Sequence, residues 1–427
     1  MEGLFLISAL MLFLIVGVPI AISLGLSSVL TLLLFSDQSL ISLSQRFFHT
    51  MEIYPLLAVP FFILAGTFMT TGGMALRLID FASATMGAIR GGLAMSTVLA
   101  CMLFAAITGS SPATVVAVGS ITIAGMVRAG YDREFATGVV ANAGTLGILI
   151  PPSIVMVVYG AITETSVGAL FMAGVVPGII LTVAMMVVIY FLARKKNFPV
   201  QPRCSVRQLL TAAREAVWGL ILIFIILGGI YGGVFTPTEA AAVAAVYAFL
   251  VAVFIYKDIG FRDVPKIVSD SAQVTSMLMF IVANAYLFAF VLTTEQIPQD
   301  AAGVILGLEM SQWLFLVAVN IILLVAGNFM VPSAVVLIMA PIIFPIAMEM
   351  GIDPVHLGII MVINMEIGMV TPPVGLNLFV ASGVSGLPLI TVIRATAPWL
   401  LLMIVMLGVI TYVPALSLWL PELLLGR

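Results

Sequence analysis

A double proline interrupts a long apolar stretch near the end of this 427-residue chain. Residues 364–383 read NMEIGMVTPPVGLNLFVASG, with Pro372 and Pro373 at the centre and Gly368 four residues before them. Because a proline has no backbone N–H and clashes with the preceding helical turn, a helix breaks here. In a bilayer an unwound backbone is tolerated only where it is buried in protein or lines a cavity. The segment therefore predicts either a structural kink or an ion or substrate site near the membrane midplane.

The same interruption occurs once earlier in the chain, which favours a site over a kink. TGSSPA is followed by GILIPPS in the first half, and NFMVPSA is followed by GMVTPPV in the second. Pro112 and Pro332 are 220 positions apart, and Pro151 and Pro372 are 221 positions apart. Periodicity of this length predicts two copies of one supersecondary unit.

The composition places these breaks in a membrane protein. Hydrophobic residues make up 63% of the chain and charged residues only 8%, whereas soluble domains carry about 25% charged residues. We predict an all-α integral membrane protein with about 11 transmembrane segments, since apolar runs long enough to span a bilayer recur throughout. The N-terminus has no basic region or cleavage site and is interpreted as a retained first helix. Nothing basic or aromatic is arranged for nucleic acid, and Cys101 and Cys204 predict no disulfide framework.

The chain is interpreted as one membrane domain over residues 1–427. Helical segments are predicted at 4–35 (kinked or split at Gly17 and Pro19), 53–71, 167–193, 216–233, 239–256, 274–293 and 396–413, with an interfacial helix at 74–92. The first repeat covers 74–193, with a hairpin tip at 108–114 and a broken helix at 142–153. A cytoplasmic basic loop and a scaffold hairpin cover 194–266. The second repeat covers 274–393, with a hairpin tip at 327–333 and a broken helix at 364–377.

Charged residues give the two hairpins opposite orientations. Arginines flank the first hairpin (Arg77, Arg90, Arg128 and Arg133), and a basic loop with Arg194, Lys195, Lys196, Arg203, Arg207 and Arg214 follows it. Acidic residues flank the second hairpin (Glu295, Asp300, Glu309, Glu349 and Asp353), and no Lys or Arg lies between Lys266 and Arg394. Since Lys and Arg mark cytoplasmic loops, the first hairpin is predicted to open to the cytoplasm and the second to the other face. Two such re-entrant hairpins, each followed by a broken helix, are typical of an inverted-repeat secondary transporter.

The residues around the breaks favour binding of an ion and a polar solute. Carbonyls of 147–152 and 368–374, with the hydroxyls of Ser110 and Thr371, would form a hard-oxygen environment suited to Na⁺. Neutral side chains that could bind substrate by hydrogen bonds are Ser111, Thr114, Asn328, Ser333 and Asn377. The alternative for any single hydroxyl is a bond to its own helix backbone.

Glu366 is an ionisable residue inside an apolar segment and is therefore a functional candidate. It either carries protons or bonds to a neighbouring helix. A proton-carrying Glu366 would fit a proton-coupled organic-anion transporter or an inorganic-ion antiporter. An intramembrane enzyme needs a nucleophile–base pair or a metal cluster, which the isolated His49 and His356 do not provide. We predict no catalytic residue and no organic cofactor, and no P-loop pattern is present.

Several long motifs resemble one transporter family over essentially the whole chain. They include LFAAITGSSPATVVAVGSI, GTLGILIPPSIVMVVYG, GVFTPTEAAAVAAVYA and GIDPVHLGIIMVINMEIGMVTPPVGLNLFV. These motifs resemble the large membrane subunit of TRAP (tripartite ATP-independent periplasmic) transporters. The resemblance implies an elevator-type, Na⁺-coupled importer of small organic acids in the cell inner membrane. It also implies two partners, a separate small four-helix membrane subunit and an extracytoplasmic substrate-binding protein.

The resemblance further implies two sodium sites, formed mostly by backbone carbonyls. The family's positions match Ser110, Gly147, Ile150 and Pro152 for one site, and Gly327, Gly368, Thr371 and Val374 for the other. The sequences GSSPATVVAVG and NMEIGMVTPPVGLN are similar to those of members that transport C4-dicarboxylates. Sialic acid importers share much of the same scaffold. Val331 departs from the acidic residue that relatives often have before the hairpin proline.

Overall fold

The computed structural model describes residues 2–35, 40–198, 200, 204–297, 303 and 310–426, and this part of the chain is helical without strands. Nine of its helical segments are long and apolar enough to cross a membrane, and further apolar helices are shorter. The prediction of an all-α membrane protein is therefore confirmed. Asp300, Glu309 and Arg203, used above to orient the chain, lie outside the described residues.

The N-terminal region forms five helices before the first hairpin. They are α1 (Glu2–Ile15), α2 (Ile20–Phe35), α3 (Leu40–Thr50), α4 (Ala58–Thr71) and α5 (Met74–Met86), with a 3-10 turn, η1 (Tyr54–Leu57), before α4. The first apolar stretch is thus split rather than kinked. The chain turns at Gly17, whose φ of 88° is one that glycine adopts without steric cost.

Two runs of helices follow the predicted repeat. The first run is α6 (Gly92–Thr108), α7 (Ser111–Arg128), α8 (Arg133–Ala143), α9 (Leu146–Leu149), α10 (Ile154–Thr163) and α11 (Val167–Lys195). The second run is α16 (Gln312–Gly327), α17 (Pro332–Glu349), α18 (Pro354–Gly368), α19 (Leu376–Ser385) and α20 (Leu389–Tyr412), followed by α21 (Ala415–Leu425). Apart from the short α9, corresponding helices begin 220 to 222 residues apart. Each run contains a helical hairpin followed by a broken helix, as the prolines predict.

The two runs interlock. In each run the helix after the break packs against the hairpin of the other run, α19 on α7 and α10 on α17. The helices that follow α19 and α10 also pack on the other run: α20 packs against α8, and α11 packs against α18. Because each run completes the packing of the other, the two breaks are brought to a common centre.

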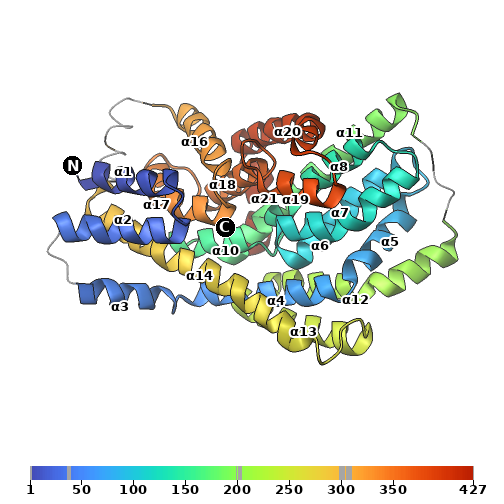
Figure 1. Cartoon of the computed structure of the whole chain (residues 1–427), viewed down its shortest axis with the longest axis horizontal. Helices are drawn as coiled ribbons and strands as arrows, with labels where there is room; N and C mark the ends of the chain where they lie inside the picture. The colour runs from blue at the N-terminus through green and yellow to red at the C-terminus, as the bar shows by residue number, and fades with distance from the viewer. Residues whose placement is uncertain are drawn as a thin grey trace.

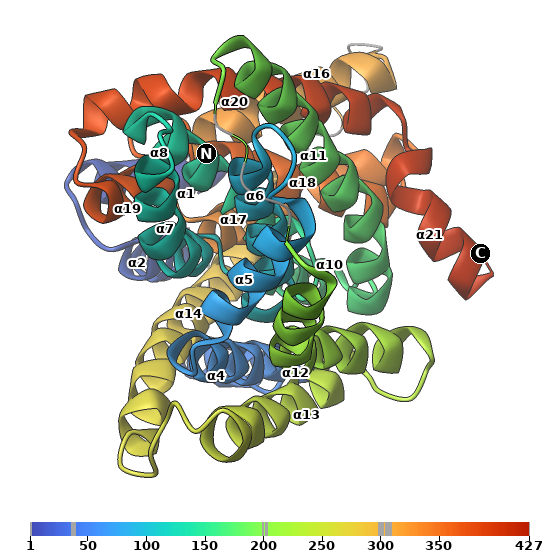
Figure 2. The same ribbon diagram turned by 90° about the vertical axis from the view of Figure 1, so that its right-hand side faces the viewer.

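The helices between and before the repeats form a layer along one side of the molecule (Figures 1 and 2). This scaffold layer consists of α4, α12 (Val206–Tyr231), α13 (Pro237–Leu250) with a π turn, η2 (Val251–Ile255), and α14 (Val264–Thr294). Within it α13 packs on α4 and α14 packs on α4 and α2. The layer lies opposite α16 and α20 in both views.

Two predicted boundaries in this layer are wrong. α12 begins at Val206 rather than near 216, and α14 begins at Val264 rather than near 274. Both extra lengths are polar, so hydropathy does not indicate them. The start of α12 is instead fixed by a capping box, in which Gln208 N–H donates to Ser205 Oγ and the Gln208 side chain accepts from Ser205 N–H.

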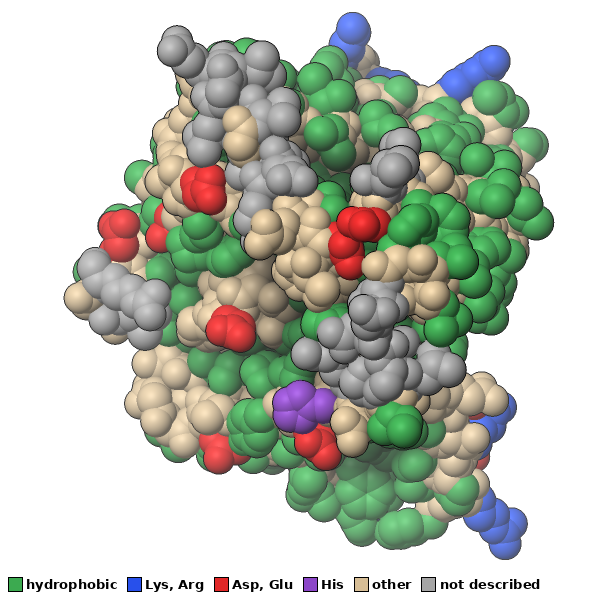
Figure 3. Space-filling model, turned by 90° about the vertical axis from the view of Figure 1, so that its left-hand side faces the viewer, with side chains coloured by type: hydrophobic (Ala, Val, Ile, Leu, Met, Phe, Trp, Pro, Cys, Tyr) green, Lys and Arg blue, Asp and Glu red, His purple; other side chains and the backbone are tan. Residues whose placement is uncertain are grey.

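Charge separates the two ends of the molecule. At the basic end Lys196 pairs with Asp132 at 2.6 Å, joining the end of α11 to the α7–α8 turn, and Arg77 pairs with Asp258 at 2.6 Å. Figure 3 shows the opposite face, where acidic side chains and a histidine are spread over the surface and Lys and Arg appear only at the edges of the view. The base of the first hairpin therefore lies at the basic end, as the flanking arginines predict.

Candidate ion and substrate site

The backbone of the first hairpin tip (108–114) approaches the backbone of the first break (142–153) closely at two glycines. A Cβ added at Gly147 would lie 2.8 Å from the carbonyl carbon and oxygen of Ser110. A Cβ at Gly109, where φ is +61°, would lie 2.5 Å from the carbonyl oxygen of Pro152. Real Cβ contacts are longer, so glycine at both positions is what permits this approach.

The second tip (327–333) and the second break (364–377) also meet through backbone atoms, although here the tip contributes the end of α16 rather than the residue before the next helix. A Cβ at Gly368 would lie 2.7 Å from the carbonyl carbon and oxygen of Gly327. Gly147 and Gly368 are equivalent in the repeat, since each precedes its double proline by four residues. In each repeat the equivalent glycine therefore contacts the backbone of its own hairpin tip. We call these two contacts the first cradle, at Gly147, and the second cradle, at Gly368.

The double prolines leave carbonyl oxygens at the breaks without their usual helical donors. The carbonyl of Gly147 has no donor four residues on, because that residue is Pro151. The neighbouring carbonyl of Ile148 accepts instead from Ser153 Oγ at 2.6 Å. In the second break Met369 O accepts from Asn377 N at 2.9 Å.

Buried acceptor oxygens without a donor gather on the same segments. Among the described residues, the amide and carboxylate oxygens of this kind are Asn142 Oδ1, Asn328 Oδ1, Asn364 Oδ1, Glu366 Oε2 and Asn377 Oδ1, whereas the unpartnered buried hydroxyls of Tyr231, Ser271 and Tyr286 lie in the scaffold layer. All five belong to the second tip or to the two breaks. A buried acceptor without a partner is costly unless water or a cation satisfies it. Five such oxygens, with the carbonyls of the cradles, therefore fit a hard cation such as Na⁺.

Side chains also join the two repeats across the centre. Asn377 Nδ2 donates to Ser111 Oγ at 2.6 Å and to Ala141 O at 3.3 Å. Thr145 Oγ1 lies 2.8 Å from Glu366 Oε1. The break of each repeat thus contacts the other repeat directly, and Glu366 bonds to a neighbouring helical segment, one of the two roles expected for it.

The structure brings some candidate residues together and leaves others apart. Ser110 lies against Gly147, Gly327 lies against Gly368, and Ser111 bonds to Asn377. The side chain of Ile150 packs toward Gly178 of α11, so only its backbone could face an ion.

Several hydroxyl groups near the breaks donate hydrogen bonds to the backbone of their own helix. This is the alternative role that the sequence analysis gives for any single hydroxyl. Thr114 Oγ1 donates to Ser110 O at 2.9 Å, and Thr371 Oγ1 donates to Ile367 O at 2.7 Å. Asn328 ends α16, and Ser333 is buried in the first turn of α17. Neither has a hydrogen bond to another candidate within the described chain.

The two cradles differ in exposure. Ser111 is fully buried and Ile150 is 8% exposed, whereas Val374 is 41% exposed and Phe329 of the second tip is 60% exposed. Unwound backbone at membrane depth is not tolerated against lipid. The second cradle therefore faces water or a partner protein, while the first is closed.

Thr145, Gly109 and Asn142 were not among the predicted site residues. Thr145 could have been found from the repeat, because it precedes Glu366 by the same 221 positions that separate Gly147 from Gly368. Gly109 and Asn142 carry no comparable signal, since their roles depend on which segments meet.

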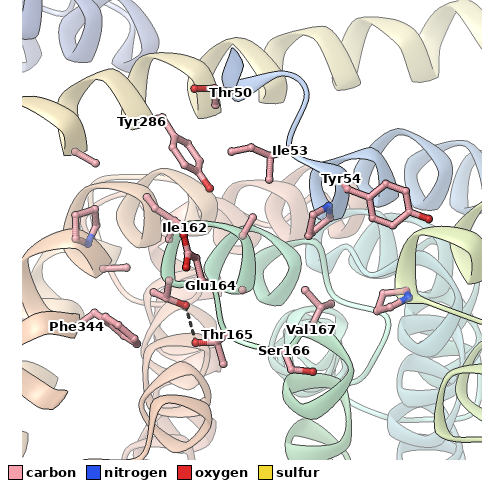
Figure 4. Close-up of a pocket in the computed structure, with 18 of the residues that line it drawn as sticks. Thr50, Ile53, Tyr54, Ile162, Glu164, Thr165, Ser166, Val167, Tyr286 and Phe344 are labelled. Atoms are coloured by element: carbon pink, nitrogen blue, oxygen red, sulfur yellow. Dashed lines mark hydrogen bonds between the residues drawn. The ribbon is translucent and has the colours of Figure 1, made fainter. Parts of the chain in front are cut away.

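A cavity of roughly 1070 Å³ lies away from both breaks, between the scaffold layer and the repeats (Figure 4). It is lined from the layer by α14 and the start of α13, and from the repeats by the α10–α11 turn and α17. Tyr286 reaches from α14 toward Ile162 and Glu164. His49 also lines the cavity and lies 3.3 Å from Glu52, which places the cavity toward the acidic face of Figure 3.

Comparison with known proteins agrees with this architecture. Residues 7–416 match the family model described as "Tripartite ATP-independent periplasmic transporter, DctM component". The chain is 65% identical over 400 residues to the C4-dicarboxylate TRAP transporter large permease protein DctM of Pseudomonas aeruginosa, covering 94% of both chains. It is 34% identical over 410 residues to the sialic acid TRAP transporter large permease protein SiaM of Vibrio cholerae, covering 96% of both.

A solved structure shares the fold. The YdaH transporter of Alcanivorax borkumensis superposes with a TM-score of 0.64 over 90% of both chains at 15% sequence identity. Together with the apolar helices, these matches describe a multi-pass protein of the inner membrane. The chain belongs to the DctM component family of tripartite ATP-independent periplasmic (TRAP) transporters.

Proposed function

We propose that this chain is the transport subunit of a Na⁺-coupled importer of C4-dicarboxylates. The observation that carries the proposal is the pair of backbone cradles at Gly147 and Gly368, together with buried amide and carboxylate oxygens without donors on the same tips and breaks. The substrate class is supported by the 65% identity to a C4-dicarboxylate permease, compared with 34% to a sialic acid permease.

Charge balance supports cation coupling. The tips and breaks (108–114, 142–153, 327–333 and 364–377) contain no Lys or Arg. A dicarboxylate entering this centre would meet oxygen atoms and half-helix ends but no fixed positive side chain. Bound sodium ions would supply the missing positive charge, so binding of the ion would favour binding of the anion.

The residues divide into ion-binding and substrate-binding sets. One sodium ion would be held by Ser110, Gly147, Ile150 and Pro152, and a second by Gly327, Gly368, Thr371 and Val374. Substrate would be bound by hydrogen bonds from Ser111, Thr114, Asn328, Ser333 and Asn377. The Asn377 amide already donates to Ser111 of the other repeat. Among the substrate-binding set it is therefore the side chain that would connect bound substrate to both repeats most directly.

The cavity of Figure 4 supports an elevator movement of the repeats past the scaffold layer. It lies between α14 and the start of α13 on one side and α17 and the α10–α11 turn on the other, and although α14 also packs on α17, the contact between the two parts is incomplete on the acidic face. The family description names a tripartite system. We infer that the other two components are a small four-helix membrane subunit and an extracytoplasmic substrate-binding protein.

Reconstitution tests this function. The chain, its small membrane subunit and its binding protein would be placed in vesicles, and uptake of labelled succinate and sialic acid would be followed under an inward Na⁺ gradient. We expect Na⁺-driven uptake of succinate and little uptake of sialic acid. Uptake driven by a pH gradient and indifferent to Na⁺ would refute the coupling and favour the proton-carrying role of Glu366.

A further inference from the structure

One hydrogen bond at the centre joins equivalent positions of the two repeats. Thr145 and Glu366 are 221 residues apart, as are Gly147 and Gly368. Both side chains are fully buried, and Thr145 Oγ1 lies 2.8 Å from Glu366 Oε1. In a two-fold arrangement a residue can contact its own equivalent only close to the axis. The bond therefore marks the pseudo-symmetry axis between the repeats.

The bond also links the two cradles along short paths. Thr145 lies two residues before Gly147, and its hydroxyl is 2.7 Å from Asn142 O at the end of α8. Glu366 lies two residues before Gly368, in the last turn of α18. The two cradle glycines are thus connected by one buried hydrogen bond with two residues of backbone on each side of it.

Given the two sodium sites of the proposed function, on which this inference rests, we propose that Thr145 and Glu366 are positioning residues that couple the two sites. An ion bound in one cradle draws the carbonyls of that break inward, and the Thr145–Glu366 bond carries the displacement to the carbonyls of the other. The first ion bound thereby prepares the second cradle. The closed first cradle and the exposed second cradle would fill together rather than independently.

Equilibrium binding of ²²Na⁺ to the purified full-length chain tests the coupling without using transport. For two sites of equal intrinsic affinity, coupling of about tenfold gives a Hill coefficient of about 1.5 and loss of coupling gives about 1; unequal affinities lower both values but keep their order. We expect the wild-type isotherm to have the higher value. Thr145→Val, which keeps the shape and removes the hydroxyl, should lower it to about 1 while two ions still bind.

A conservative variant and a matched control separate coupling from stability. Thr145→Ser keeps a hydroxyl at the contact and should keep the wild-type steepness. Thr122→Val removes another buried hydroxyl, which donates to Val118 O at 2.9 Å on α7, and should leave the steepness unchanged. If Thr145→Val does not fold, Thr145→Ala removes the same hydroxyl.

The outcomes distinguish this inference from the proposed function. A steep isotherm in a folded Thr145→Val or Thr145→Ala variant would overturn the coupling, as would a Hill coefficient of 1 in the wild type. A wild-type chain that binds no Na⁺ would overturn the proposed function and, with it, the coupling.

Discussion

The contact between Gly368 and the second hairpin tip predicts the effect of a single added methyl group. In Gly368→Ala the new Cβ would lie 2.7 Å from the carbonyl carbon and oxygen of Gly327, and both are backbone atoms that no rotamer change can move aside. The tip must retreat by about 0.7 Å to reach the 3.4 Å of an ordinary contact. Overpacking of this kind costs about 1–3 kcal/mol. Since 1.4 kcal/mol is a factor of ten, we expect the Na⁺ concentration for half-maximal succinate uptake to rise roughly 5- to 150-fold.

A matched variant controls for the effect of alanine on a helix. Gly383 lies in α19, after the same break, and an added Cβ there meets nothing within 4 Å. Gly383→Ala should leave the Na⁺ dependence unchanged. The assay is Na⁺-driven uptake by the reconstituted complex, with expression and melting temperature compared for both variants. A folded Gly368→Ala variant with the wild-type Na⁺ dependence would refute the assignment of this cradle.

Three further results are expected. Thr371→Val removes a candidate ligand oxygen and should raise the Na⁺ concentration for half-maximal uptake about tenfold, whereas Thr371→Ser should stay within about twofold; equal effects of both would contradict a ligand role. In a background without native cysteines, Val374→Cys should react with a membrane-impermeant thiol reagent and Ile150→Cys should not, because the two side chains are 41% and 8% exposed. Equal labelling of both variants would show that the cradles do not differ in access. Asn377→Ala removes the donor to Ser111 and should raise the KM for succinate about 5- to 100-fold with little change in Na⁺ dependence, and a shift confined to Na⁺ dependence would place Asn377 in an ion site instead.

The sequence predicts the hairpins and breaks well because proline acts locally. Pro112, Pro151, Pro332 and Pro372 lie at the start of a hairpin helix or inside a break, and no tertiary contact can restore the missing N–H. Helix starts in the scaffold layer are predicted poorly, because the first turns of α12 and α14 mix charged and polar residues with apolar ones and so lack the hydropathy of a membrane span. The Ser205–Gln208 capping box was a usable signal for the first of these starts.

The contacts between repeats could not be read from local pattern. That α19 packs on α7 and α10 on α17 depends on how the two runs interlock, and this decides that Asn377 meets Ser111. The cavity of Figure 4 depends on the same packing and had no sequence signal. The Thr145–Glu366 pair is intermediate, since the repeat interval identifies the two positions as equivalent but not that they touch.

The central claim is that two mirrored cradles each hold one sodium ion, and the number of ions bound tests it most directly. At the lowest ²²Na⁺ concentration that saturates the wild type with two ions, Gly147→Ala and Gly368→Ala should each bind between one and two ions, and the double variant should bind the fewest. Wild-type binding by the folded double variant would contradict the account.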